Sequence, residues 1–235
     1  MKEILLIWVQ ESENGTLLPT EEELCKRFGV SRQTIRQAIS GLSEEGLVTR
    51  HPGQGTFVKR SKVIRDTRWA LEDFNREMQS HGLKPETVVL SIHREKSMDF
   101  VSRQLKIAPD ALVVVIQRLR FVDGWPMVVQ QSYLPYALFE SIESKKEELV
   151  TRSLHSIIEK DYHYALQTAE RTIEAIPAPS QEADLLKVAP GSPVLYSTSI
   201  WKAASGNIVE YVLEWYRGDK SQFKIQLGRK SHSEP

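Results

Sequence analysis

Residues 18–47, LPTEEELCKRFGVSRQTIRQAISGLSEEGL, decide the fold of the first part of the chain. Thr20 and Glu23 have the spacing of a capping box, which begins a helix, and Gly29 ends that helix. Ser31 can cap a second helix directly after the tight turn. Two short helices joined in this way form a helix-turn-helix pattern. The apolar positions that the second helix is expected to bury are Ile35, Ala38, Ile39 and Leu42.

The outer face of this second helix, the recognition helix, carries side chains suited to the major groove of DNA. Arg32 and Arg36 lie one turn apart, so both can reach the same groove edge and bond to guanine O6 and N7. Gln33 and Gln37 can recognise adenine in a similar way. Residues 26–43 contain four basic and no acidic side chains, whereas the whole chain balances 31 Lys and Arg against 31 Asp and Glu. This pattern favours DNA binding, and a merely solvated helix face is the alternative.

A small hairpin is expected after Gly46. Residues 47–50 and 56–59 have the pattern of two short strands, and the glycine-rich HPGQG at 51–55 joins them. A hairpin in this position can act as a wing, laying Gln54 and backbone amides along the adjacent minor groove and its phosphates.

The remaining N-terminal residues predict one more helix and a boundary. Ile4, Leu5, Trp8 and Val9 form an apolar stripe that ends at Asn14-Gly15, which predicts a short first helix. A polar, basic run without apolar period follows the hairpin, as expected of a linker. The predicted divisions are a winged helix-turn-helix domain at 1–60, a linker at 61–70 and an effector-binding and dimerisation domain at 71–235.

The second domain alternates β-branched runs with short helices, which predicts an α+β fold with a mainly antiparallel sheet. The runs 112–122 and 127–134 flank the turn sequence Asp123-Gly-Trp-Pro126 and should pair antiparallel. Further strands are expected at 87–93, 167–175, 194–201, 209–216 and 223–227, and helices at 71–81, 100–105, 153–162 and 181–188.

Several functional classes are excluded by composition and motif. Cys25 is the single cysteine, which excludes disulfide frameworks and multi-cysteine zinc sites and suits a reducing compartment. The sequence has no nucleophile elbow, phosphate loop or metal-ligand spacing, and its six histidines are dispersed. The apolar run 4–9 is too short for a signal sequence or a membrane span. We therefore expect a cytoplasmic protein without catalytic residues, metal, cofactor or membrane association.

Four segments carry a resemblance to a known family: LPTEEEL at 18–24, FGVSRQTIRQA at 28–38, LSEEGL at 42–47 and GQGTFV at 53–58. They closely resemble the winged-helix domain of GntR-family bacterial transcription regulators. The DNA-binding candidates are Arg32, Gln33, Thr34, Arg36, Gln37, Arg50, His51, Gly53, Gln54 and Gly55. Glu22 and Gln54 stand where the family often has arginine, so we expect DNA binding to depend less steeply on salt than is usual for the family.

Residues 71–228 resemble the UTRA effector domain of the HutC-type subgroup, whose fold is similar to that of chorismate lyase. The resemblance is carried by FNREM at 74–78, RLR at 118–120, SYLP at 132–135, RSL at 152–154 and YRGD at 216–219. It implies that Arg118, Arg120, Ser153 and His155 hold an anionic group, and that Gln130, Glu210 and Tyr216 line the rest of the pocket. Gln130 replaces a frequent glutamate and His155 a tyrosine, which leaves the ligand class open.

Strand periodicity tests this site in part. Arg118 and Arg120 end an apolar stripe, so they either meet an anion or simply leave the core for solvent. We predict a three-residue loop at 123–125, which pairs Arg118 with Gln130, whereas a two-residue turn would place them on opposite faces.

Two further features of the predicted site stay open at this stage. Glu210, Glu214 and Tyr216 share one strand face, which suits a polyol or an exposed edge. A solvated His155 would titrate near neutrality, so effector affinity is expected to change between about pH 6 and 7.5.

Together these features predict a bacterial transcription repressor. It is expected to bind a palindromic operator in double-stranded DNA as a homodimer, and to leave when a small anionic metabolite, such as a sugar phosphate or carboxylate, fills the pocket. The alternatives are a chorismate-lyase-like enzyme and an effector-independent DNA-binding protein.

Overall fold

The computed structural model describes residues 1–12, 15–44, 46–59, 63–66 and 74–225. The chain divides into two compact units, Met1–Val63 and Ile64–Pro235. This division falls within the stretch predicted as a linker, of which residues 61–62 and 67–70 lie outside the described residues. Four residues of that stretch form a strand, β3 (Val63–Asp66), which the sequence interpretation missed because the run has no apolar alternation.

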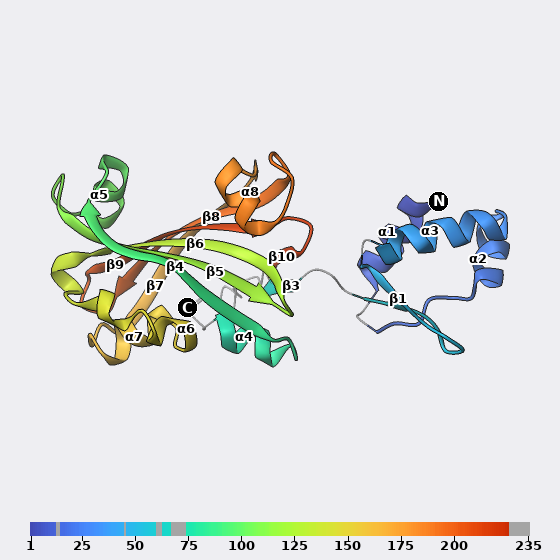
Figure 1. Cartoon of the computed structure of the whole chain (residues 1–235), viewed down its shortest axis with the longest axis horizontal. Coiled ribbons are helices and arrows are strands. Elements are labelled where there is room, and N and C mark those ends of the chain that lie inside the picture. The colour runs from blue at the N-terminus through green and yellow to red at the C-terminus, as the bar shows by residue number, and fades with distance from the viewer. Residues whose placement is uncertain (13–14, 45, 60–62, 67–73, 226–235) are drawn as a thin grey trace, which may run out of the picture. The chain divides into compact units, whose positions relative to one another are not determined.

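The first unit has the predicted order of helices and hairpin (Figure 1). Its apolar core joins all five elements and includes Leu5, Leu24, Ile35, Ile39, Leu42, Val48 and Val58. The first helix ends three residues earlier than Asn14, which itself lies outside the described residues. The elements are α1 (Lys2–Glu11), α2 (Glu21–Phe28), α3 (Arg32–Glu44), β1 (Val48–His51) and β2 (Gly55–Val58).

Both predicted helix caps are confirmed. The Thr20 hydroxyl accepts from the backbone amide of Glu23, and the Glu23 carboxylate accepts from the backbone amide of Thr20 at 2.8 Å. The amide and the hydroxyl of Thr20 both donate to the Glu23 carboxylate and hold its pKa below the ordinary value. Gly29 ends α2 in the left-handed conformation, at φ 65°, and Ser31 accepts from the amide of Thr34 at the start of α3. Local chemistry therefore sets the turn between the two helices.

The wing contains one segment more than the sequence predicts. β1 and β2 pair antiparallel, with His51 opposite Gly55 at the tip. On the other edge of β2, Leu17 forms a bridge with Phe57, and the amide of Leu18 donates to the carbonyl of Thr56. The residues before α2 thus cover the free edge of β2, which fixes the wing against the helices.

The second unit is built on a six-stranded antiparallel sheet in the order β4-β5-β6-β9-β8-β7. A separate two-stranded sheet pairs β10 with β3. These findings confirm the α+β class and the antiparallel sheet. The strands are β4 (Pro85–Lys96), β5 (Leu112–Val122), β6 (Trp125–Pro135), β7 (Leu166–Pro177), β8 (Pro193–Ala203), β9 (Ile208–Arg217) and β10 (Ser221–Lys224).

Helices cover both faces of this sheet, α5 and α8 on one and α6 and α7 on the other (Figure 1). The predicted start of a helix at Leu71 and the end of a strand at 226–227 lie outside the described residues. The three short helices between Tyr136 and Thr151 were not predicted. The helices are α4 (Phe74–Ser80), α5 (Asp99–Leu105), η2 (Tyr136–Leu138), η3 (Ile142–Lys145), α6 (Glu148–Thr151), α7 (Leu154–Lys160) and α8 (Ser180–Leu186).

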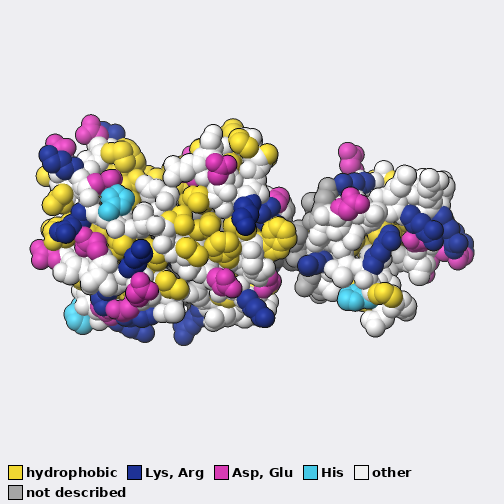
Figure 2. Space-filling view, in the orientation of Figure 1, with side chains coloured by type: hydrophobic (Ala, Val, Ile, Leu, Met, Phe, Trp, Pro, Cys, Tyr) yellow, Lys and Arg dark blue, Asp and Glu magenta, His cyan; other side chains and the backbone are white. Residues whose placement is uncertain are grey.

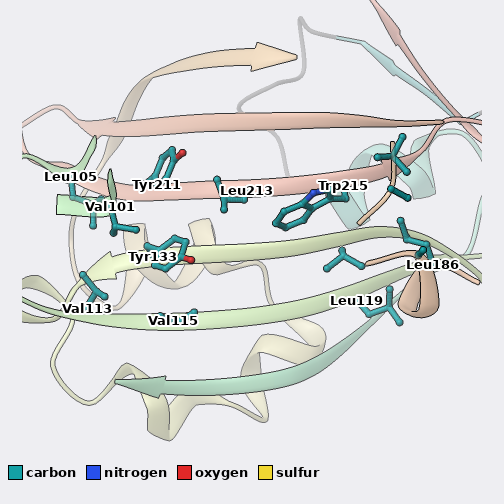
Figure 3. Close-up of a cluster of buried hydrophobic side chains, with 14 residues drawn as sticks. Val101, Leu105, Val113, Val115, Leu119, Tyr133, Leu186, Tyr211, Leu213 and Trp215 are labelled. Carbon is teal, nitrogen blue, oxygen red and sulfur yellow. The ribbon is translucent and has the colours of Figure 1, made fainter. Parts of the chain in front are cut away.

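The two faces of the sheet differ in chemistry. Beneath α5 and α8 lies an apolar cluster in which Tyr133 and Tyr211 stack and Leu213 and Trp215 continue the row (Figure 3). Alternate residues of the same strands face the other way, toward α7. That second face is apolar at one end only, and its polar end is the site described below.

The turn between β5 and β6 corrects one prediction and confirms another. The loop has two residues, Asp123 and Gly124, both with positive φ, so the predicted three-residue loop is wrong. Arg118 nevertheless pairs with Gln130, because a β-bulge shifts the register: Phe121 faces Pro126 but Arg120 faces Val128. The extra residue returns Gln130 to the face of Arg118.

Candidate functional site

One rung of the sheet carries polar side chains across four strands. Arg118, Gln130, Glu214 and Ser197 lie directly opposite one another on β5, β6, β9 and β8. They share their face with further polar residues of the neighbouring rungs and of α7. We call the following residues the polar cluster: Arg118, Arg120, Gln130, Ser132, His155, Arg171, Glu210 and Glu214.

The two strand arginines are buried within this cluster. Arg118 is 2% exposed and donates to the Ser132 hydroxyl at 3.3 Å. Arg120 donates from Nε to Gln130 at 3.0 Å, and its guanidinium lies 5.0 Å from the ring centre of Phe74 on α4. The alternative that the stripe leaves the core for solvent is therefore wrong.

Glu214, which the strand period had placed beside Glu210, and Arg171, which was not a candidate, both belong to the cluster. Gln130 donates to one Glu214 oxygen at 2.8 Å, and an Arg171 nitrogen lies 3.4 Å from the other oxygen. Arg171 also donates to Ser199 at 2.7 Å. The sequence left open whether Glu214 faced a ligand or an exposed edge, and β7 gives no periodic signal at Arg171.

His155 and Glu210 form a second pair at the end of the cluster. The ring Nε2 of His155 lies 2.8 Å from a Glu210 oxygen, and the ring packs against Trp201. The histidine is thus not simply solvated, and its side chain is 22% exposed. Burial raises the pKa of Glu210, but His155, the Ser132 hydroxyl and the Arg118 guanidinium together outweigh burial and hold that pKa below its ordinary value.

Two predicted site residues hold structural positions, Ser153 as a helix cap and Tyr216 in the core. The Ser153 hydroxyl caps α7 by accepting from the amide of Ser156 at 3.0 Å, and its own hydrogen can still be donated. Tyr216 is buried, and its ring meets Phe223 of β10 edge to face. The structure therefore places the five predicted strand residues on one sheet face and joins His155 of α7 to Glu210, whereas Ser153 is seen only as the cap of α7.

Replacing Glu210 with glutamine is expected to weaken the acid dependence of stability. Because the native pKa of Glu210 lies below 4.5, the ionised carboxylate stabilises the fold fully above that pH, and this contribution is lost as the pH falls through the native pKa. The melting temperature of the wild type should therefore drop more steeply below about pH 4.5 than that of Glu210→Gln. Glu174→Gln, on the exposed side of β7, is the control, and equal slopes for Glu210→Gln and wild type would contradict the prediction.

The polar cluster contains both basic and acidic side chains. Three guanidinium groups, those of Arg118, Arg120 and Arg171, share the cluster with the carboxylates of Glu210 and Glu214. A guanidinium fork suits a planar or tetrahedral anion. The arrangement can therefore accept one anionic group from a ligand, with amide, hydroxyl and carboxylate groups beside it.

The second candidate surface is the outer face of α3. Arg32 and Arg36 have side chains that are 65% exposed, and Gln33 and Gln37 are exposed beside them. Thr34 differs, because its hydroxyl lies 2.9 Å from that of Ser31 and supports the helix cap. The structure thus leaves four of the five predicted α3 side chains open to a groove.

The wing presents its predicted residues to solvent. The exposed ones are Arg50, His51, Gly53, Gln54 and Gly55. The His51 ring packs edge to face on Phe57, beside an open depression that Gln54 and Lys59 also line. Gly55 has φ +115°, a conformation that L side chains rarely adopt, so this turn requires glycine.

Acidic side chains of α2 lie among these basic ones. Glu21 accepts from Arg36 Nε at 2.8 Å, and Glu22 pairs with Lys26 at 3.0 Å and approaches Arg32 at 3.8 Å. Figure 2 shows acidic and basic side chains together over the α2 and α3 end of this unit. The local charge counted from the sequence is therefore corrected downward, because packing brings the first turn of α2 beside α3.

Replacing Glu22 with arginine is expected to steepen the salt dependence of DNA binding. The first helix of such a motif crosses the DNA backbone, so a cation there can gain a phosphate contact. Each contact adds about 0.9 to the slope of log K against log salt, which fluorescence anisotropy with a random-sequence duplex can measure. Glu86→Arg in the second unit is the control for total charge, and an equal slope change in both variants would contradict the prediction.

Comparison with known proteins matches one family model within each unit of the chain. The family described as bacterial regulatory proteins, gntR family, matches residues 5–58, and the UTRA domain matches residues 80–222. The transcriptional repressor NagR of Bacillus subtilis is 30% identical over 224 residues, covering 93% of this chain and 90% of that protein. The mannosyl-D-glycerate transport/metabolism system repressor MngR of Escherichia coli is 28% identical and covers 94% and 90%.

A solved structure shows the same fold. PhnF from Mycobacterium smegmatis superposes with a TM-score of 0.69, covering 97% of this chain and 99% of that one at 21% identity. No helix in the described part of the chain is long and apolar enough to cross a membrane.

Proposed function

Because this chain belongs to the GntR family of bacterial transcription regulators, in the group with a UTRA domain, we propose that it is an effector-controlled repressor. Members of this family are regulators and not enzymes. Residues 1–60 bind DNA, 61–70 link the parts, and 71–235 bind the effector and form the dimer. A regulator of this kind acts on the chromosome and hence in the cytoplasm.

The operator is a palindrome in double-stranded DNA read by a homodimer. A single recognition helix spans only one half-site in the major groove, and two-fold protein symmetry requires two matching half-sites. Arg32, Gln33, Arg36 and Gln37 contact the groove, and the wing residues from Arg50 to Gly55 contact the neighbouring backbone. The exposure of these side chains on one unit supports this assignment.

The effector is a small anionic metabolite, and the observation that carries this proposal is that Arg118 and Arg120 lie buried on the same face of the sheet. Arg118 and Arg120, with Ser153 and His155, hold the anionic group. Gln130, Glu210 and Tyr216 bind the rest of the molecule, and their carboxylate and amide groups suit the hydroxyls of a sugar. The relative named for mannosyl-D-glycerate supports a sugar-derived anion.

A thermal-shift screen followed by DNA release tests this proposal. The purified protein is mixed with sugar phosphates, sugar acids and dicarboxylates. At about 100-fold above Kd a ligand adds about 2.7 kcal/mol, which for this size raises the melting temperature by about 2–4 °C per kcal/mol. A stabilising anion should also dissociate a labelled operator duplex in fluorescence anisotropy.

Three outcomes would contradict parts of the proposal. An anion that stabilises the protein without releasing DNA would point to an effector-independent DNA-binding protein. Stabilisation only by uncharged sugars would remove the anionic class. Sedimentation of the operator complex with one chain per duplex would overturn the homodimer.

A further inference from the structure

One polar contact of the N-terminal unit joins the two helices of the helix-turn-helix. Glu21, in the first turn of α2, accepts from Arg36 Nε on α3 at 2.8 Å, although fifteen residues separate them in the chain. The Arg36 side chain is 65% exposed, and that of Glu21 is 29% exposed. The carboxylate therefore lies on the inner side of the guanidinium, and the rest of the guanidinium faces solvent.

This contact limits how Arg36 can bond to a base. Arginine carries five N–H donors in a planar fork, and it can approach guanine either through its two terminal nitrogens or through Nε and one terminal nitrogen. With Nε held by Glu21, only the first edge remains for the base. The contact also reduces the freedom of a long side chain before DNA binds.

The three acidic residues of α2 differ in how they contact α3. Glu23 is used in the helix cap, and Glu22 pairs with Lys26 of its own helix and lies 3.8 Å from Arg32. Glu21 alone among these three accepts a hydrogen bond from a recognition-helix arginine. The Glu21 carboxylate weakens the attraction of this surface to DNA phosphates. Its role must therefore lie in a property other than DNA affinity.

We propose that Glu21 is a positioning residue that makes Arg36 specific for guanine. It presents the terminal edge of the guanidinium to the base and disfavours rotation of the side chain toward a phosphate. The inference rests on the proposed DNA-reading role of α3 and adds a determinant of base preference that lies on α2. Affinity for DNA of any sequence is lower than it would be without this carboxylate.

The test is selection from a random-sequence duplex library, followed by sequencing of the bound fraction. The proteins are the wild type, Arg36→Ala, Glu21→Ala, Glu21→Gln and the matched control Glu22→Ala. Affinity for the selected duplex, and for the same duplex changed at the position that depends on Arg36, is then measured by anisotropy. Melting temperatures confirm that each variant is folded.

Glu21→Ala is expected to reduce preference at the position that depends on Arg36 by about fivefold or more, as loss of a good bidentate contact would. It should also raise affinity for unselected DNA, because a negative charge is removed. Glu21→Gln, which still offers an acceptor oxygen, should retain part of the preference. Glu22→Ala should raise affinity for unselected DNA and leave the base preference unchanged.

Other results would overturn the inference. Unchanged base preference in Glu21→Ala, with higher affinity for all sequences, would show that Glu21 only lowers DNA affinity. Equal loss of base preference at every position would show that Glu21 supports the fold of the unit and does not act on Arg36. If Glu21→Ala does not fold, Glu21→Gln decides the question. Full base preference in Glu21→Gln, together with unchanged affinity for unselected DNA, would show that Glu21 does not position Arg36. If the wild type selects no sequence, the proposed function itself fails, and the inference with it.

Discussion

Replacing Arg118 with alanine is expected to abolish release of DNA by the anionic effector while leaving operator binding unchanged. The guanidinium is buried on the sheet face that also holds Arg120, so its loss removes one of the two guanidinium groups proposed to hold the anionic group. Truncating one partner of a buried, hydrogen-bonded charge pair costs about 2–5 kcal/mol, which corresponds to a loss of effector affinity of about 30-fold or more. The α3 surface lies in the other unit and keeps its residues.

The measurement is effector titration of the preformed operator complex by fluorescence anisotropy. Arg94→Ala, an exposed arginine on β4 that pairs with Glu143, is the matched control and should release DNA normally. Arg118→Lys keeps the charge without the fork and should respond only at higher effector concentration. A double variant of Arg118 and Arg120 that still responds fully would show that the effector binds elsewhere.

Replacing Arg36 with alanine is expected to weaken operator binding by about 1–3 kcal/mol and to relax the base preference at one position of each half-site. The side chain is exposed on α3, one turn from Arg32, and a bidentate contact to guanine has this magnitude. Affinities for the operator and for single-base variants of it measure both effects. The effector response should stay intact, because Arg36 lies in the first unit.

The control for this variant is Lys26→Ala, which removes a cation from α2 without removing a candidate base contact. Lys26→Ala should weaken binding to all sequences alike and lower the salt slope. If Arg36→Ala behaves in the same way, Arg36 contacts a phosphate and does not read a base.

The sequence by itself determined the features that depend on neighbouring residues. The capping box of Thr20 and Glu23, the left-handed Gly29 and the Ser31 cap each act over one turn of chain, so α2, the tight turn and α3 follow from local chemistry. The period of apolar residues likewise predicted the strands of the antiparallel sheet. The effector residues were named from the family resemblance, and five of them, on β5, β6 and β9, lie on one face of the sheet.

Only the tertiary structure decided how distant residues meet. The pairing of Arg118 with Gln130 depends on a two-residue turn compensated by a bulge. Neither the length of the turn nor the bulge can be read from strand alternation. Arg171 joins Glu214 across two strands of the sheet, and Glu21 joins Arg36 from the helix before it, so both pairs depend on how whole elements pack. A cap or a period is fixed by the backbone within one turn, whereas strand register and charge pairing are fixed by the packing of the whole unit. Local patterns therefore specify the elements of this protein, and only their assembly specifies which charges lie together.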